Sequence, residues 1–171
     1  MDKLATFIDE EYPFSYISHN RLIARAVIIN DKNEVLLERT YRNDKFGESN
    51  NVETPGGGVK ENESLALACI REVKEECGLN IEIIKEIGCI EDDYNIIHRH
   101  NISNYFLARI ISQGEKSQEE YEKNMIIGFD FYPLDDAIKI YENPQSRFAK
   151  VVYKRELVIL KEVKKMLGGS L

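Results

Sequence analysis

Three glutamates within five residues are the part of this sequence best suited to chemistry. Glu72, Glu75 and Glu76 stand at i, i+3 and i+4 of a segment with helical periodicity, so they share one face of a helix. Like charges at this spacing destabilise a helix, whereas carboxylate oxygens are what a hard cation such as Mg²⁺ prefers. The pattern therefore indicates either a solvated acidic face or a magnesium site.

A glycine-rich loop precedes this helix and favours the metal site. Pro55 is followed by three glycines, residues 56–58. Glycine has no Cβ, so backbone carbonyls of such a loop can approach an ion that the helix binds. The loop and the acidic face together predict two walls of one metal site.

The same residues resemble a family motif, the Nudix box of the Nudix hydrolases. Its pattern is G-x5-E-x7-R-E-U-x-E-E-x-G-U, where U is an aliphatic residue. All nine specified positions are present in strict register over 23 residues: Gly57, Glu63, Arg71, Glu72, Val73, Glu75, Glu76, Gly78 and Leu79. The sequence is therefore similar to Nudix hydrolases.

This resemblance implies a cofactor and its ligands. In that family the box binds Mg²⁺, with Mn²⁺ as an alternative. Carried over to this chain, the metal ligands are Gly57 through its carbonyl, Glu72, Glu75 and Glu76. Glu63 and Arg71 are implied as supporting residues of the catalytic site, which hold the acidic face in place.

The resemblance also implies a reaction, in which water cleaves a phosphoanhydride bond. The substrate is a nucleoside diphosphate linked to another moiety, such as a dinucleoside polyphosphate, a (d)NTP or a nucleotide sugar. Substrate phosphates and protein carboxylates are both negative, so metal ions must bridge them. A carboxylate must accept the proton of the attacking water. The candidates are Glu72 in the box and three loop residues, Glu119, Glu120 and Glu122, among which we select Glu120.

Substrate recognition is assigned to a few side chains outside the box. Arg39 and Arg42 follow a predicted strand, and a guanidinium can pair with a phosphate in bidentate fashion. Arg25, on the preceding strand, is a further candidate. Tyr94 lies 16 residues after Gly78. A tyrosine near this distance resembles a feature of the Nudix enzymes that act on dinucleoside polyphosphates. Surface ion pairs and core packing are the alternative explanations.

A different class of function must be weighed against the enzyme. A Nudix-fold module that senses a nucleotide without cleaving it need not keep the box glutamates. Glu72, Glu75 and Glu76 are all present, which favours a metal-dependent pyrophosphohydrolase.

The elements that position these residues follow from hydrophobic periodicity and turn signals. In chain order we predict two strands in residues 22–39 joined by a hairpin-type turn at 30–33, a polar loop at 40–53, a helix at 64–77, strands at 80–90 and 98–111, a charged loop at 112–124, a strand at 125–132, and helices at 133–141 and 146–167. The fold class is α+β, a Nudix-type α/β/α sandwich with a mixed sheet, the box helix and C-terminal helices. Residues 1–171 form a single domain, whose last helix packs on it or contributes to a homodimer.

Composition narrows the partners and the compartment. Apolar residues make up 43% of the chain and charged residues 31%, and the net charge is −7. An acidic chain disfavours broad nucleic-acid binding but accepts a small nucleotide through a bound cation. No apolar run long enough to span a membrane and no signal peptide is present, so we expect a cytoplasmic protein. The three cysteines lack CxxC spacing, which argues against a disulfide framework or a structural zinc site.

Overall fold

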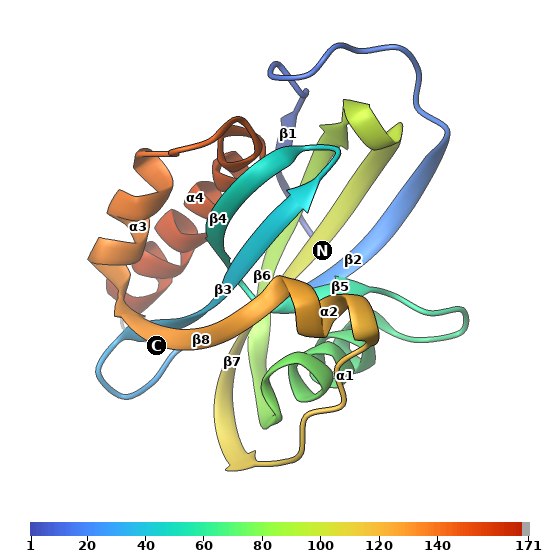
Figure 1. Ribbon diagram of the computed structural model, residues 1–171. Coiled ribbons are helices and arrows are strands. Elements are labelled where there is room, and N and C mark those ends of the chain that lie inside the picture. Colours follow the sequence, from blue (N-terminus) through green and yellow to red (C-terminus); the bar gives the residue numbers. More distant parts are fainter. Residues whose placement is uncertain (169–171) are drawn as a thin grey trace.

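The computed structural model describes residues 1–168 of the chain and contains two sheets and four α-helices (Figure 1). The elements are β1 (Lys3–Phe7), β2 (His19–Ile28), β3 (Glu34–Asp44), β4 (Gly47–Glu53), β5 (Gly56–Gly58), α1 (Leu65–Cys77), β6 (Leu79–Tyr94), a 3-10 turn (Asn95–Ile97), β7 (Arg99–Gln113), α2 (Glu120–Met125), β8 (Ile126–Pro133), α3 (Leu134–Glu142) and α4 (Arg147–Gly168).

The two sheets have different strand orders. The larger has the order β1-β6-β7-β2-β5, with β1–β6 and β2–β7 parallel and β6–β7 and β2–β5 antiparallel, so it is mixed. The smaller has the order β4-β3-β8 and is antiparallel. Helix α1 lies on one side of the strands and α3 with α4 on the other (Figure 1). This confirms the predicted α+β class and the sandwich architecture.

Alternation along β2 explains how one strand serves both helical layers. Ala26 and Ile28 are fully buried in the core that contains Val73 of α1. Val27, between them, is fully buried in the other core, which contains Leu160 of α4. Successive side chains of a strand point to opposite faces, so a short apolar strand buried on both faces binds the layers together.

The predicted helices agree with the structure to within one or two residues. The helix predicted at 64–77 is α1, the one at 133–141 is α3 and the one at 146–167 is α4. Helix α4 packs on its own domain, against α3 and strands β6, β1 and β4. Among residues 1–168, no helix combines the length and the apolar character needed to cross a membrane.

Two predictions for the polar segments were wrong. The loop predicted at 40–53 is the end of β3 and the whole of β4, paired from Glu38–Glu53 to Asp44–Gly47. Its inward residues are themselves polar, including the buried Ser49 and Asn51, so no hydrophobic alternation marks the strands. The charged loop predicted at 112–124 contains the start of α2.

Two further differences concern strand pairing. Strands β2 and β3 do not form a sheet hairpin, because they belong to different sheets and share only an isolated bridge between Ile29 and Val35. The glycines at 56–58, predicted to break regular structure, form β5 and pair with β2. A Cβ on Gly56 would lie 2.3 Å from the carbonyl oxygen of Ala24, so only glycine permits this close pairing.

Candidate active site

Helix α1 carries the acidic residues and is fixed at both ends. The hydroxyl of Ser64 accepts a hydrogen bond from the Leu67 backbone at 3.2 Å, and Gly78 ends the helix with φ of 68°, a left-handed conformation that suits glycine. One stripe of the helix packs in the core: Ala68, Cys69, Val73 and Cys77. Glu72 and Glu76, one turn apart, are also buried, so the packing of α1 directs both carboxylates inward.

Arg71 organises the outer side of this helix, and we call Glu63, Arg71 and Glu75 the Arg71 cluster. Its guanidinium donates to Glu63 at 2.7 and 2.8 Å, to Glu75 at 2.9 Å and to Glu72 at 2.7 Å. It also donates to the carbonyl oxygen of Gly58 at 2.9 Å. This hydrogen bond connects the helix to strand β5 (Gly56–Gly58), which we continue to call the glycine loop. The hydrogen bonds from Arg71 lower the pKa of Glu63 to about 2. The structure thus brings the two predicted supporting residues together.

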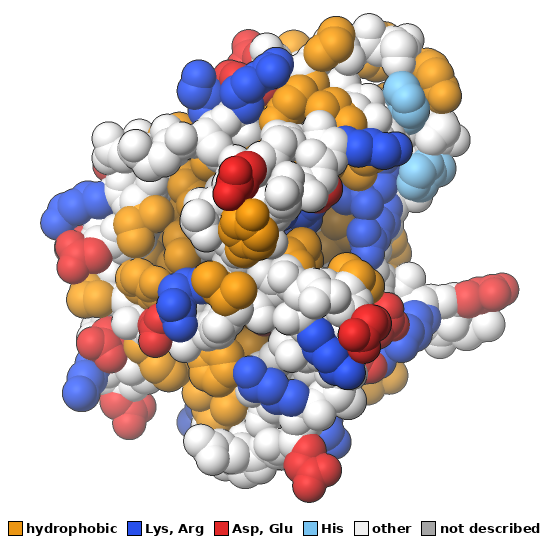
Figure 2. Space-filling view, viewed as in Figure 1, with side chains coloured by type: hydrophobic (Ala, Val, Ile, Leu, Met, Phe, Trp, Pro, Cys, Tyr) orange, Lys and Arg blue, Asp and Glu red, His pale blue; other side chains and the backbone are white. Residues whose placement is uncertain are grey.

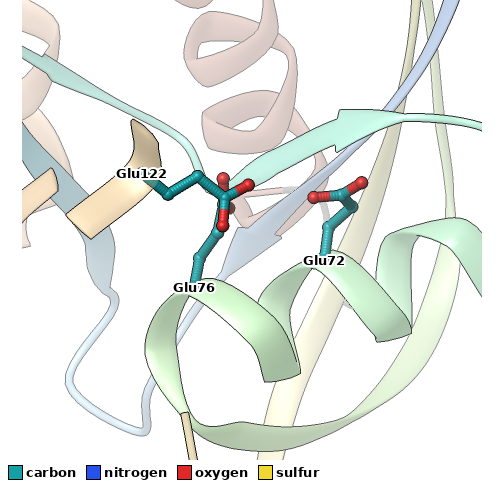
Figure 3. A group of neighbouring side chains, drawn as sticks. All are labelled: Glu72, Glu76 and Glu122. Carbon is teal, nitrogen blue, oxygen red and sulfur yellow. The ribbon is translucent and has the colours of Figure 1, made fainter. Parts of the chain in front are cut away.

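Three carboxylates face one another on the inner side, and we call Glu72, Glu76 and Glu122 the buried acidic cluster (Figure 3). Glu72 and Glu76 project from α1 and Glu122 from α2, with one oxygen of each within 4.8 Å of the others. Among residues 1–168, no lysine or arginine nitrogen lies within 4.0 Å of the carboxylates of Glu76 or Glu122. Burial raises the pKa of both Glu72 and Glu76. This cluster therefore concentrates negative charge without an internal counter-ion for two of its members.

The glycine loop forms the second wall of this cluster. The backbone N–H of Gly56 donates to Glu76 at 2.8 Å. A Cβ on Gly57 would lie 2.6 Å from the carboxyl carbon of Glu72, so any side chain at this position would displace that carboxylate. Glycine is required here because the backbone and the acidic face approach so closely.

A fourth buried carboxyl, Glu38 of β3, borders Glu76. Burial raises its pKa to about 7, and the neighbouring charges of Glu38 and Glu72 add to the upward shift of the Glu76 pKa. Glu38 accepts a hydrogen bond from the thiol of Cys77 at 3.3 Å. Burial and these neighbours therefore raise the carboxyl pKa values on the inner side of α1, and a bound cation would act in the opposite direction.

A cavity of about 120 Å³ opens beside Glu76 and Gly57. Its walls come from β2, β7 and β6 of the larger sheet, from β3, and from α2 and α4. Figure 2 shows basic side chains gathered along one wall of a hollow in this face of the molecule. Five arginines line the cavity: Arg21, Arg25, Arg42, Arg99 and Arg155. A negatively charged ligand therefore fits this space better than a neutral one.

The structure divides the residues predicted to bind substrate. Arg42 lines the cavity, where its guanidinium lies 4.4 Å from the centre of the Phe148 ring. Tyr94 also lines it and accepts a hydrogen bond from Arg155 through its hydroxyl. Arg39 does not line it: its side chain is 46% exposed and pairs with Asp130 at 2.8 Å. The predicted binding residues Arg42 and Tyr94 are thus brought together, and Arg39 is not.

The structure separates the loop glutamates in the same way. Glu120, selected from the sequence as the loop's proton acceptor, has a side chain that is 86% exposed and lies 3.5 Å from Lys123. Glu122 is buried and joins the acidic cluster instead. A weak signal for this was present, because Glu122 and Met125 stand at i and i+3 and so share a helix face.

Three of the cavity arginines, Arg21, Arg99 and Arg155, and the buried Glu38 were not predicted from the sequence. Arg21, Ile23 and Arg25 alternate along β2, and this period of two places them on one face of the strand. Arg99 and Asn101 alternate in the same way on β7. No local pattern marks Arg155, which belongs to the inward stripe of α4 and is fully buried.

The mixed sheet is covered by α1 on one face and by α3 and α4 on the other (Figure 1), and Glu76 of the box helix lines a cavity. This arrangement is that of a hydrolase of the Nudix type. A family model described as NUDIX domain matches residues 19–153. The chain belongs to the Nudix family, and its enzyme class is that of a Nudix-type pyrophosphohydrolase.

Individual proteins show the same relationship. An RNA pyrophosphohydrolase of Ruthia magnifica subsp. Calyptogena magnifica is 28% identical, and the alignment covers 76% of this chain and 82% of that protein. A NUDIX hydrolase from Nitrosomonas europaea has a similar fold, with a TM-score of 0.64 at 17% identity over 88% of this chain and 90% of that one. A MutT protein from Methanosarcina mazei Go1 gives a TM-score of 0.59 at 23% identity, over 83% of this chain and 98% of that one.

Proposed function

We propose that this protein hydrolyses a phosphoanhydride bond in a nucleoside diphosphate linked to another moiety, with Mg²⁺ as cofactor and Mn²⁺ as an alternative. The observation that carries the proposal is the buried acidic cluster. One oxygen of each carboxylate lies within 4.8 Å of the others, and one of the three residues, Glu76, lines a cavity that also contains five arginines.

The donor set of this cluster suits a hard divalent cation. All three side chains are carboxylates, which Mg²⁺ and Mn²⁺ prefer over nitrogen or sulfur ligands. Burial of a carboxylate is costly, and burial raises the pKa of Glu72, although Arg71 pairs with it, and of Glu76, which has no such partner among residues 1–168. A divalent cation would remove the cost by neutralising the charge.

Glu72, Glu76 and Glu122 are the ligands that we propose from this arrangement. The family resemblance adds Glu75 and the carbonyl of Gly57. Glu75 pairs with Arg71 and its side chain is 24% exposed, so it stands at the outer edge of the acidic face. When bound, the cation supplies polarisation of the phosphoryl oxygens and a lower pKa for a coordinated water.

The chain's own residues supply positioning and proton transfer. Arg71 and Glu63 hold the glycine loop against α1, so the carboxylates keep their spacing. Glu122 or Glu72 accepts the proton of the attacking water, because each has a carboxylate oxygen within 4.8 Å of Glu76, which lines the cavity. Arg42 pairs with substrate phosphate inside the cavity.

The proposed substrate is a small nucleotide. The candidate substrate classes are dinucleoside polyphosphates, (d)NTPs and nucleotide sugars. The relative named RNA pyrophosphohydrolase adds RNA to the substrates that should be tested. The net charge of −7 disfavours broad, sequence-independent binding of nucleic acid. We place the protein in the cytoplasm.

A phosphate-release screen tests this function. The purified protein is assayed with each substrate class at millimolar Mg²⁺, at millimolar Mn²⁺ and with EDTA, beside a Glu76→Gln variant. We expect release from at least one class that requires the cation and is lost in the variant. Tight nucleotide binding by calorimetry without any release would instead support the alternative, a binding module that does not cleave its ligand.

A further inference from the structure

The arginines of the cavity fall into two groups by their partners. Arg155 pairs with Glu53 at 3.1 Å, Asp92 at 3.3 Å and Glu156 at 3.2 Å, all buried. Arg25 donates to the carbonyl oxygen of Thr54 at 2.6 Å and lies 3.7 Å from Glu53. Arg42 pairs with Asp44 at 2.6 Å. Each of these three arginines therefore has at least one carboxylate partner within the protein.

Arg21 and Arg99 have no such partners. Within residues 1–168, no carboxylate oxygen lies within 4.0 Å of either guanidinium. Among residues 1–168, the Nε of Arg99 is buried without a hydrogen-bond partner, as are those of Arg25 and Arg42, so the absence of a carboxylate partner is what distinguishes Arg99 from them. The Oδ1 of Asn101, a residue only 1% exposed, is also buried without a partner. Burial, then the nearby charge of Arg21, lower the pKa of Arg99 to about 10. Two adjacent cations facing one cavity are a destabilising arrangement that an anion would relieve.

The strand register places these groups on one wall. Strands β2 and β7 are parallel, and Arg21 is opposite Asn101. Arg99 precedes Asn101 by two residues, so both project from the same face of β7. The Arg99 guanidinium lies 5.4 Å from the ring centre of Tyr94, a cation–π contact that orients it.

This wall adjoins the buried acidic cluster. A Cβ on Gly58 would lie 3.0 Å from Nη2 of Arg21, so the guanidinium packs directly over the glycine loop. The neighbouring Gly57 contacts the carboxylate of Glu72 in the same way. A ligand can therefore reach from the acidic cluster along the loop to Arg21 and then to Arg99.

We propose that Arg21 and Arg99 form an anion subsite that binds a phosphate group beyond the two joined by the scissile bond. The substrate class is thus a nucleotide with three or more linked phosphates, rather than a nucleotide sugar with two. This rests on the proposed function for its scissile bond, but the subsite itself depends only on the cavity wall. Guanidinium pairs suit phosphate because each can donate two parallel hydrogen bonds.

Metal-free binding tests the subsite independently of hydrolysis. Inorganic tripolyphosphate is titrated by calorimetry into the protein in EDTA, for the wild type, Arg21→Gln and Arg99→Gln. We expect each substitution to weaken binding by roughly 10- to 100-fold, the usual worth of a hydrogen bond between charged groups. Arg109→Gln is the matched control, because Arg109 is also on β7 but is exposed and paired with Glu82 at 2.6 Å. It should bind tripolyphosphate as the wild type does.

Stability gives a second readout. Arg99→Gln removes an unpaired, largely buried charge, so it should melt at or above the wild-type temperature, whereas a structural arginine would lower it on removal. Arg99→Lys keeps the charge and loses the fork of donors, so it should bind tripolyphosphate with intermediate affinity.

Two outcomes would overturn the subsite: unchanged affinity in both Arg21→Gln and Arg99→Gln, or an equal loss in Arg109→Gln. The hydrolysis proposal is tested by a different variant, so its failure can be distinguished from failure of the subsite. A Glu76→Gln variant should lose turnover and still bind tripolyphosphate, since it retains both arginines.

Discussion

Two groups of charged side chains meet on helix α1 and differ in how their charge is balanced. In the Arg71 cluster, one guanidinium donates to Glu63, Glu75 and Glu72 and to a loop carbonyl. In the buried acidic cluster, Glu76 accepts a backbone hydrogen bond and Glu122 accepts hydrogen bonds near its own helix start. Neither of these two carboxylates meets a cation among the described residues.

The pKa values of the two clusters differ in the same way as their charge balance. Hydrogen bonds from Arg71 lower the pKa of Glu63 to about 2, whereas burial raises the pKa of Glu76. Charges that a fold balances internally serve its structure, and charges that it leaves unbalanced mark where a ligand belongs. The Arg71 cluster should therefore matter for stability and the acidic cluster for turnover.

The largest effect is expected from two glutamates of α2 that differ in position. Glu122→Gln should lower turnover by roughly 10²- to 10⁴-fold, the range for losing a general base, because its carboxylate belongs to the acidic cluster. Glu120→Gln should keep near wild-type turnover, because its carboxylate points to solvent. Steady-state rates on the best substrate of the screen measure both. The reverse ranking would restore the original choice of Glu120.

Substitution of Arg71 should lower stability, in contrast to substitution in the buried acidic cluster, which should lower turnover. Arg71→Gln removes the hydrogen bonds that the guanidinium makes to Glu63, Glu72 and Glu75 and leaves these carboxylates close together, so we expect about 1 to 3 kcal/mol of lost stability. Urea denaturation of the metal-free protein measures this, with Glu76→Gln as the comparison. Glu76→Gln should unfold at the same or a higher urea concentration, because a neutral amide replaces a carboxyl whose charged form is disfavoured by burial and by Glu38 and Glu72. Equal destabilisation by both substitutions would contradict the proposal that the Arg71 cluster serves stability and the buried acidic cluster serves turnover.

How much of this site the sequence could predict depends on how local each signal is. Glu63, Arg71, Glu72 and Glu76 stand within 14 residues in a fixed register, so a single helix and its preceding loop define their arrangement. The caps of α1, Ser64 and Gly78, are local for the same reason. Helices α1, α3 and α4 and the α+β class follow likewise from periodicity within one segment, whereas the six-residue α2 was missed.

Features made by distant segments could not be predicted. Arg99 and Arg21 become neighbours only because β2 and β7 pair in parallel, and Arg155 reaches Glu53 across 102 residues. Strand β4 lacks hydrophobic alternation because its inward residues meet polar partners instead of the core, and Asn51 donates to Ser49 at 3.0 Å. Patterns of hydrophobicity carry no information about such polar pairings.

Magnesium should stabilise the acidic cluster by a moderate amount. An ion that binds only the folded state adds about 1.4 kcal/mol at ten times its dissociation constant, so the melting temperature should rise by a few degrees. Thermal melts with EDTA and with millimolar Mg²⁺ measure the shift. Glu76→Gln should show a smaller shift than the wild type. An equal shift in the variant would place the bound ion elsewhere.

The smallest effect concerns pH and the carboxyl of Glu38. Its pKa is raised to about 7 in the folded protein, above the ordinary value of 4.5, by burial. A raised carboxyl pKa means that the folded state retains a proton that the unfolded state has lost. That contribution to stability is fully present below pH 4.5 and disappears as the pH rises through 7. Glu72 and Glu76 shift in the same direction, whereas Glu63, with a pKa near 2, stays ionised throughout this window.

The metal-free protein should therefore lose stability between pH 5 and pH 8, by at most about 1.4 kcal/mol per pH unit for each proton. Urea denaturation in EDTA at several pH values measures the slope. Glu38→Gln should flatten it, because it removes one titrating group and the repulsion that Glu76 experiences. Glu61→Gln, an exposed carboxylate in the loop before α1, should keep the wild-type slope. A stability that rises across this range, or an unaltered slope in Glu38→Gln, would show that the acidic side of α1 is as well balanced as the Arg71 cluster.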